Sequence, residues 1–563
     1  MSRTSGQAAA TRTLLVAALG AACAAALIAC GSSDSALGAA GASGAGAQGG
    51  HAGAATGGTA GSGGVAGSDA SAGGSDTGTD AGASGAPGDA GADGAADSSS
   101  ADGAGGGDGA SDAGIDAPVS TYCGDGIRDP ITEECDDGPG ASTADSCSAS
   151  CRVQDLLFAA GPGSSQADKR TPGSGRHTIA AGDGGFAMVF LEQSLQPMAV
   201  RLRAFDTKGV PGNLVTVAQD ATITSSAAPV IAALPGGKYA VAYTDLNADG
   251  YGRGVALRIV DAAAASVGAL VRVNTVTHLN QEAPDVIWTG SALAVAYRDE
   301  SNVLNKGDVR LRSFSASGGS IGADVALAAS KNGEGSVALA AFAGGYAAAW
   351  WDLGAGTQDL VVQAGSKKWK WSLLTAGVAQ SLPSLVELDQ SRLLVVYALG
   401  GSGGTVPRLY GAVLDTSQSS SPPPFDIAPL LEPYASDSSL GQEQPAVARA
   451  GNSIFIAWKS DSISGGTIGT ELWLKEVPLS NSAGTLALNF SFAEIALPRS
   501  SAHTVGHQSL PSLAAMPPGL GAALAAGWED RGHGFGSTQG TPDVVAQFMP
   551  VPIVRQPSEG GLE

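Results

Sequence analysis

A repeat of short apolar runs constrains this chain more than any other feature. Each run follows a turn region, often rich in glycine, and ends in an aromatic residue, usually with an acidic residue two positions later. Seven copies are visible, and their aromatic residues are Phe190, Tyr243, Tyr297, Trp350, Tyr397, Trp458 and Trp528. Consecutive aromatic residues lie 53, 54, 53, 47, 61 and 70 positions apart. This spacing fits one four-stranded blade of a β-propeller per copy.

A second motif keeps the same register. Gln-x-x-Pro opens four copies, beginning at Gln281, Gln380, Gln442 and Gln508, and Pro229 holds the place of the proline in another copy. Within the third copy, turn residues separate four short apolar or alternating runs, "PDVIWTG", "ALAVAYRDE", "DVRLRSFSA" and "DVALAAS". Helical spacing with caps is absent. We therefore expect an all-β protein with a seven-bladed β-propeller over residues 154–554 and a tail over residues 555–563.

Closure of the ring requires a strand from outside the last copy. That copy offers "PSLAAMP", "GAALAAGWED" and "DVVAQFMP", but proline interrupts its fourth run. The segment "DLLFAAG", residues 155–161, is a spare strand in front of the first copy. We expect it to complete the last blade and to remove the open sheet edge.

The first 29 residues have the pattern of an export signal. Arg3 and Arg12 precede an uncharged apolar run that ends in Leu27-Ile28-Ala29-Cys30. This ending resembles the lipobox of bacterial lipoproteins. The resemblance implies cleavage before Cys30 and attachment of lipid to its thiol, which would anchor the chain without a membrane-spanning helix. A secretory signal cut nearby and an uncleaved membrane anchor remain as alternatives.

Residues 30–120 are expected to form a disordered tether. From Gly31 to Ser120 the chain has no Lys, Arg, Phe, Tyr or Trp, and it contains eleven Asp. Such a segment buries too little apolar area to offset its conformational entropy. The whole chain carries a net charge of −22 and shows no basic stripe, so nucleic acid is not expected as a partner.

Four of the six cysteines lie in one short stretch, at Cys123, Cys135, Cys147 and Cys151. An exported segment of this size cannot build a hydrophobic core, so we predict a disulfide-stapled module over residues 121–153 whose pairing remains open. Zinc is the alternative, but only Cys147 and Cys151 approach the spacing of a zinc pair. The acidic residues between these cysteines, from Glu133 to Asp137, are a candidate calcium site or simply solvated charge.

The cysteine-rich segment resembles a known bacterial repeat. "CGDGIRDPITEECDDG" followed by "DSCSASC" is similar to the myxobacterial cysteine-rich repeat, except at Pro139 and Ser146. This resemblance implies an extracellular, surface-associated module without catalytic activity. The apolar repeats loosely resemble secreted bacterial proteins with Q-x-x-P…VAW-x-D units, which implies a fold and no activity.

Three patterns within the repeats are candidate sites. The acids after the aromatic residues are expected to accept hydrogen bonds from turn amides; they are Glu192, Asp245, Asp299, Asp352 and Asp530. Asp245, Asn247 and Asp249 have the spacing of the first half of a calcium loop, but a bidentate Glu does not follow. "KKWKW", residues 367–371, is expected to be a strand with Trp inward and Lys outward, or else a platform for sugar rings.

No catalytic constellation is apparent in the sequence. The inner strands are mostly Ala, Val, Leu and Ser, and Arg449 is expected at a rim. We therefore expect a lipid-anchored protein of the outer membrane or cell surface that is not an enzyme. Its propeller would act as a binding or scaffold module for an unknown surface protein or glycan. The alternatives are an enzyme that acts on extracellular polysaccharide and a purely structural surface component.

Replacing Cys30 by Ala tests the anchor. Because the thiol is the lipid acceptor, the variant is expected to lose lipid labelling and to be released or mislocalised. Metabolic labelling and detergent partitioning measure this. Unchanged partitioning into the detergent phase would show that Cys30 does not anchor the chain.

Overall fold

The computed structural model describes most of the repeat region and a few residues before it. The described residues are 133, 135, 136, 147, 149, 151, 156, 157, 169, 170, 177–302, 307–331, 333–353, 357–375, 382–400, 406–427, 441–464, 467–482, 485–491, 495–497, 508–517, 523–530 and 543–550. The predicted signal segment, Cys30, the tether and Cys123 lie outside them. No helix that could cross a membrane occurs among these residues.

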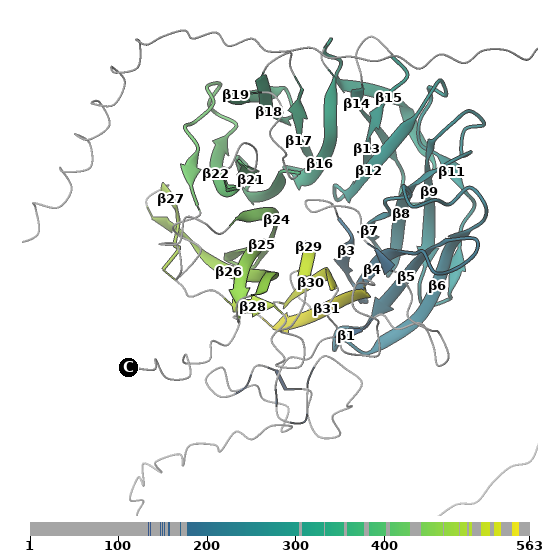
Figure 1. Cartoon of the computed structure of the whole chain (residues 1–563), viewed down its shortest axis with the longest axis horizontal. Coiled ribbons are helices and arrows are strands. Elements are labelled where there is room, and N and C mark those ends of the chain that lie inside the picture. The colour runs from purple at the N-terminus through teal and green to yellow at the C-terminus, as the bar shows by residue number, and fades with distance from the viewer. Residues whose placement is uncertain are drawn as a thin grey trace, which may run out of the picture. The chain divides into compact units, whose positions relative to one another are not determined.

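Seven antiparallel sheets form a ring, which confirms the predicted all-β, seven-bladed propeller (Figure 1). The inner strands are β3 (Ile179–Gly182), β7 (Val230–Leu234), β12 (Gln281–Trp288), β16 (Glu334–Phe342), β20 (Ser384–Asp389), β24 (Gln442–Ala450) and β29 (Gln508–Ala515). The second strands are β4 (Gly185–Glu192), β8 (Lys238–Asp245), β13 (Leu293–Asp299), β17 (Gly345–Asp352), β21 (Arg392–Leu399), β25 (Ser453–Ser464) and β30 (Ala523–Asp530).

Two further rows of strands complete the blades. The third strands are β5 (Ala199–Phe205), β9 (Gly254–Asp261), β14 (Asp308–Phe314), β18 (Thr357–Ala364), β22 (Arg408–Asp415), β26 (Thr467–Ser482) and β31 (Asp543–Pro550). The outer strands are β6 (Pro211–Gln219), β10 (Ser266–Val267), β11 (Val271–Arg272), β15 (Ser320–Ala328), β19 (Lys367–Thr375), β23 (Phe425–Asp426), β27 (Thr485–Leu488), β28 (Ile495–Leu497) and β1 (Leu156–Leu157). A short strand, β2 (Lys169–Arg170), also pairs with β4.

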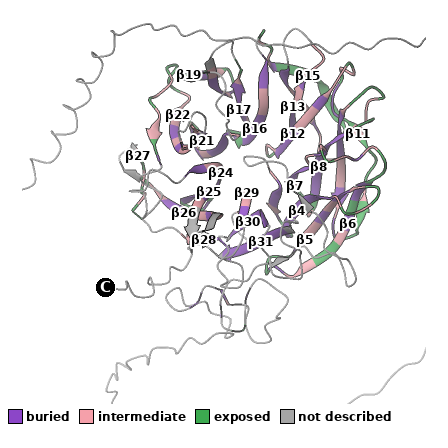
Figure 2. Cartoon of the chain, viewed as in Figure 1, coloured by how far each residue is buried: buried purple, intermediate pink, exposed green. Residues whose placement is uncertain are grey.

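The core lies between the blades. Seven hydrophobic clusters draw their propeller residues from two neighbouring blades each, around the full ring. The seven repeat aromatic residues are at most 1% exposed, which explains why one large ring recurs in every copy. Burial is concentrated in the inner and middle strands, and exposed residues are common on the outermost ones (Figure 2).

The ring closes as the sequence predicts. Strand β1 pairs antiparallel with β31, with Leu156 opposite Ala546 and Leu157 opposite Val545. Blade packing closes the ring as well, because one cluster joins residues of the first and last blades, including Met188 and Ala525. Gly527 gives room at this junction, since a Cβ atom there would lie 2.8 Å from the sulfur of Met188 and that side chain would have to move.

The Gln-x-x-Pro motif forms a β-bulge at the start of an inner strand. The residue before the proline has a positive φ of 56° at Ala283, 57° at Gln444 and 57° at Leu510, and the strand register shifts at each of these places. Proline cannot donate to the ladder, so a bulge accommodates it. The Gln281 amide donates to Asp299 at 3.0 Å.

The acids at the ends of the second strands have structural roles. Asp245 accepts the backbone N–H of Asn247 at 2.8 Å, and Asp299 accepts that of Ser301 at 3.0 Å. These two bonds are the turn contacts predicted from the sequence. Glu192 instead pairs with Arg201, and Asp352 pairs with Lys370.

The cysteine-rich segment contains disulfides. Cys135 is bonded to Cys147, and Cys151 also belongs to a disulfide. The predicted staples are thus present among the described cysteines. Glu133, Asp136 and Cys151 place one ligand atom each within 4.8 Å of the others, but a sulfur in a disulfide is not the thiolate that binds a metal.

Deleting residues 154–162 tests ring closure. The deletion removes β1 and exposes the edge of β31, so stability is expected to fall nearly as much as on deletion of the last repeat from Gln508 onward. Thermal unfolding of the two deletion variants and the parent measures this. A protein without 154–162 that melts within about two degrees of the parent would contradict closure, because an open array loses little from its end.

Candidate active site

Equivalent positions of the inner strands can be aligned on the motif proline. Pro229, Pro284, Pro383, Pro445 and Pro511 occupy this position in five blades. In the first blade the place belongs to His177, because the pairing of Ile179 with Met188 puts His177 opposite Phe190. We call it the proline position and count onward along each inner strand.

The position after the proline joins neighbouring blades. The hydroxyl of Ser384 accepts the backbone N–H of Val447 in the next blade at 3.1 Å. The hydroxyl of Ser512 accepts the N–H of Thr178 at 3.2 Å, which joins the last blade to the first. Asp285 performs the same function in the third blade, where its Oδ2 accepts the N–H of Leu339 at 2.7 Å.

Asp285 differs from its equivalents because it is a carboxylate with a second partner. Its Oδ1 lies 2.9 Å from Nδ1 of His177 and 3.3 Å from the His177 backbone nitrogen. The Asp285 side chain is 0% exposed, whereas that of His177 is 32% exposed. The carboxylate therefore fixes the ring through Nδ1, and Nε2 is the nitrogen left to meet a ligand.

The environment of His177 changes its pKa in two opposing ways. Burial lowers the pKa, but the negative charge of Asp285 and its hydrogen bond to the ring raise it, and the net pKa lies above the ordinary value of 6.5. The His177–Asp285 ion pair thus stabilises the fold fully below about pH 6.5, and this contribution is lost as pH rises through the folded pKa.

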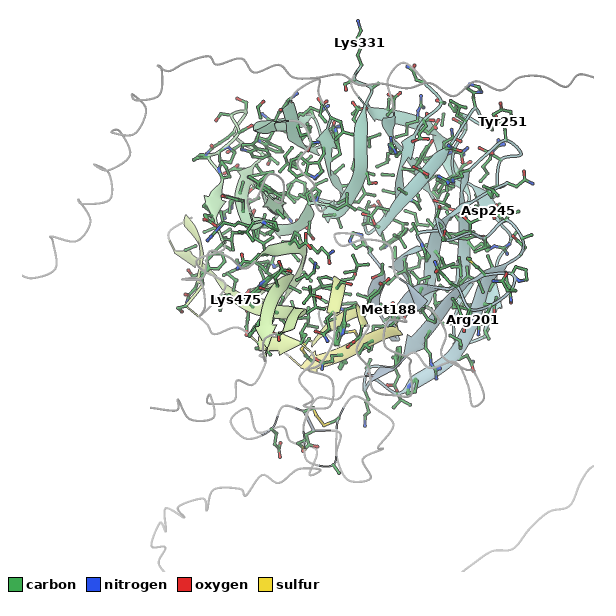
Figure 3. The ribbon with its side chains drawn as sticks, viewed as in Figure 1. Met188, Arg201, Asp245, Tyr251, Lys331 and Lys475 are labelled. Atoms are coloured by element: carbon green, nitrogen blue, oxygen red, sulfur yellow. A yellow bond between two sulfur atoms is a disulfide. The ribbon has the colours of Figure 1, made fainter. Side chains whose placement is uncertain are left out.

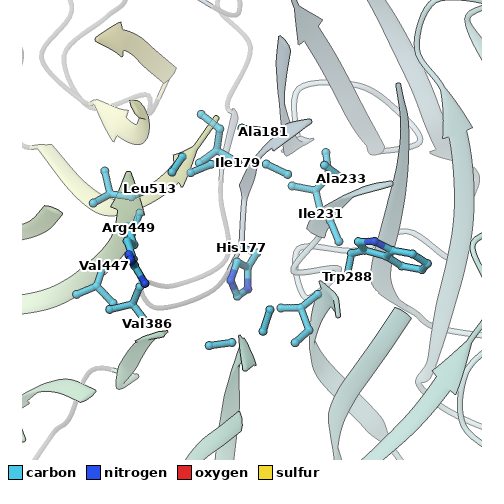
Figure 4. A pocket seen from close by; sticks show the side chains of 18 of the residues that line it. His177, Ile179, Ala181, Ile231, Ala233, Trp288, Val386, Val447, Arg449 and Leu513 are labelled. Atoms are coloured by element: carbon cyan, nitrogen blue, oxygen red, sulfur yellow. The ribbon is translucent and has the colours of Figure 1, made fainter. Parts of the chain in front are cut away.

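His177 lies at the floor of a pocket of about 420 Å³ in the centre of the ring. Residues from all seven inner strands line this pocket. Figure 4 shows the imidazole at the centre of the lining side chains, with Arg449 and Trp288 on opposite sides and the indole directed away from His177. A volume of this size is typical of a small-molecule site.

The mouth of the pocket lies four residues beyond the proline position. Four blades have alanine there, at Ala181, Ala233, Ala341 and Ala515. The other three have Trp288, Glu387 and Arg449, which are only partly buried or exposed. Arg449 is anchored at the rim because Nη1 donates to the Leu388 carbonyl at 2.6 Å and Nε to the Gly451 carbonyl at 3.1 Å. This placement agrees with the expected rim position of Arg449.

The predicted calcium ligands lie elsewhere and have protein partners. Figure 3 shows Asp245 and Tyr251 at the periphery of the ring. Asp245 bonds the Asn247 N–H, while the Asp249 carboxylate accepts from the Tyr251 N–H at 3.0 Å and the Asn274 amide at 2.8 Å. These contacts stabilise the loop, and calcium binding there stays a prediction.

The "KKWKW" segment is a structural strand. Trp369 is 1% exposed and Trp371 is 6% exposed, and the Trp371 indole donates to the Pro422 carbonyl at 2.8 Å. Lys368 and Lys370 are exposed. The prediction of Trp inward and Lys outward is confirmed, and the alternative of a sugar platform is wrong because the indole rings are buried.

His177, Asp285 and Glu387 were not predicted from the sequence as site residues. His177 precedes the first strand of the repeat, so no motif marks it. The sequence does contain an indication of Asp285. This residue follows Pro284 directly, where other blades have Val230, Ser384, Ala446 or Ser512. A charged residue that breaks a column of small residues indicates a local role that the repeat does not need.

Comparison with known proteins gives structural matches only. No protein-family model and no curated protein matches the chain. The polysaccharide lyase Uly1 is 10% identical, with 67% of this chain and 90% of that chain covered and a TM-score of 0.40. The α-L-arabinofuranosidase Arb93A from Fusarium graminearum is 10% identical, with 69% and 97% covered and a TM-score of 0.35. An exo-1,5-α-L-arabinanase from a bovine ruminal metagenomic library is 12% identical, with 58% and 94% covered and a TM-score of 0.30.

These matches correct the functional prediction from the sequence. We expected a binding or scaffold module without enzymatic activity, whereas the matched proteins are carbohydrate-active enzymes. That expectation is therefore wrong. It arose because the inner strands show few charged residues, and their pairing across blades cannot be seen in the sequence. The likeness concerns the fold and transfers neither a substrate nor a residue role to this chain.

Titration of His177 by NMR tests the pair. We expect a pKa above 6.5 in the parent and a pKa below 6.5 in Asp285→Asn, because the charge is lost while burial remains. An unchanged His177 titration in Asp285→Asn would contradict the assigned pair.

Proposed function

We propose that this protein is a carbohydrate-active enzyme that cleaves an acidic extracellular polysaccharide in the central pocket. The observation that supports this function most directly is the His177–Asp285 pair at the pocket floor. A partly exposed imidazole held by a buried carboxylate has one nitrogen fixed and one free for proton transfer. Neither group is required by the repeat.

The lining favours elimination over hydrolysis. Hydrolysis by the usual route uses two carboxyl groups on either side of the scissile bond. Among the described lining residues Glu387 is the one carboxylate, and it lies at the mouth, whereas Asp285 is buried behind His177. Elimination from a uronate unit needs only one acid–base group, which His177 provides. We therefore assign elimination as the reaction.

His177 would carry the proton through the reaction. Its Nε2 removes the proton from the carbon next to the uronate carboxylate, and that electron pair forms the new carbon–carbon double bond. The bond to the glycosidic oxygen then breaks, and the imidazolium returns its proton to the leaving oxygen. Asp285 holds the ring in place and stabilises the imidazolium, which makes it a positioning residue.

Arg449 would draw the acidic chain to the mouth. The whole protein carries a net charge of −22, which opposes approach of a polyanion. The guanidinium of Arg449 is exposed at the rim. Two of its N–H groups donate to backbone carbonyls, and its remaining N–H groups can donate to a ligand. Glu387 in the neighbouring blade limits the positive charge to one side of the mouth.

The N-terminal motifs support a proposal for the location of the enzyme. We propose export, lipid attachment at Cys30 and display at the outer membrane or cell surface by the tether of residues 30–120. The cysteine-rich module, with its Cys135–Cys147 bond, suits an oxidising compartment. This placement brings the pocket to polymers that cannot enter the cell.

Activity of the full chain on uronate polysaccharides tests the proposal. Cleavage should produce ultraviolet absorbance from the unsaturated product, and His177→Ala should lower the rate about 10²–10⁴-fold, the usual contribution of acid–base catalysis. Because the base must be neutral, the rate should rise with pH through the raised pKa of His177. His278→Ala is the matched control and should keep parental activity. Cleavage without unsaturated product, or an active His177→Ala, would contradict this function.

A further inference from the structure

The pocket is enclosed on all sides by the ring. Each of the seven inner strands contributes lining residues, so no side of the pocket lacks a wall. Direct bonds hold neighbouring inner strands together near the floor. Besides the bonds of Asp285, Ser384 and Ser512, the Ile231 N–H donates to the His177 carbonyl at 2.7 Å.

Among the described residues the pocket narrows sharply below His177. The next space beyond the imidazole has a volume of only about 20 Å³ and is lined by His177, Ser384 and Ser512, among others. Such a space holds about one water molecule and cannot pass a sugar ring. As formed by the described residues, the pocket is thus a blind well, with its opening at the level of Trp288, Glu387 and Arg449.

The imidazole lies far below the mouth of the well. Four residues of extended strand separate the proline position from the mouth, which is about 13 Å at the usual rise per residue. A ligand must travel this distance along the ring axis to reach Nε2 of His177. A long polymer lying across the mouth would keep its linkages far from the imidazole.

We infer that the enzyme acts only on chain ends and releases short products, which rests on the proposed function. The geometry excludes internal linkages, because a chain passing through the site would need a second exit or an open side. The substrate class is therefore the terminal units of an acidic polysaccharide. The four alanines at the mouth leave more room for an entering sugar chain than larger side chains would.

Substrate length separates chain-end from internal cleavage. At a fixed mass of polysaccharide below saturation, shortening the chains about tenfold should raise the rate about tenfold, because the number of ends rises in proportion. Short products should accumulate from the start while viscosity falls slowly. A rapid fall in viscosity with a ladder of intermediate lengths would overturn chain-end action and leave the proposed function intact.

Binding provides a test that does not depend on turnover. The NMR signal of His177 should respond to uronate oligosaccharides and to polymer in proportion to their chain ends. An NMR response of His177 that is instead equal per sugar unit for oligosaccharide and polymer would contradict chain-end binding, whether or not cleavage is detected. Absence of cleavage with an end-dependent response would contradict the proposed reaction alone.

Introducing a tryptophan at the mouth by substitution tests whether substrate enters there. Ala341 is exposed at the rim, so Ala341→Trp should narrow the opening without disturbing the core and lower the rate on chain ends at least about tenfold. Ile321 is 53% exposed on the outer strand β15, and Ile321→Trp should leave the rate unchanged. Equal rates for both folded variants would contradict entry through this mouth.

Discussion

The carboxylate of Asp285 joins three parts of the molecule. One oxygen accepts the Leu339 N–H and so links the third blade to the fourth, while the other holds His177 of the first blade. A buried carboxylate is costly unless its oxygens are satisfied, and here both oxygens have partners. The same contacts that join blades of the ring thus place an imidazole on its axis.

The repeat separates structural from functional residues. Residues needed by every blade recur, such as the buried aromatic residues of the second strands. Residues that break the repeat at the ring centre are His177, Asp285, Trp288, Glu387 and Arg449, and all but Asp285 line the same pocket. Trp288 also packs against the cluster between the second and third blades. A charged or ionisable residue that breaks the repeat instead indicates a local role that the repeat does not need.

The sequence predicts the architecture well because its determinants are local and periodic. The spacing of the aromatic residues and the Gln-x-x-Pro bulges establish the number of blades, and the spare strand before the first blade implies closure with β31. The site was not predictable in this way. His177 and Asp285 are 108 positions apart, and only the rotation of two blades around the axis brings them together. Calcium ligation by Asp245 and Asp249 was suggested by spacing alone, whereas the structure gives their oxygens protein donors.

The most direct test of this account is Asp285→Ser, with unfolding and turnover measured on the same protein. Serine is the residue that joins blades at Ser384 and Ser512, so it can keep the bond to Leu339 while it removes the charge that holds His177. The account predicts a melting temperature within a few degrees of the parent and a rate lowered at least about tenfold. A variant with parental stability and parental turnover would contradict the claim that Asp285 and His177 form the active site.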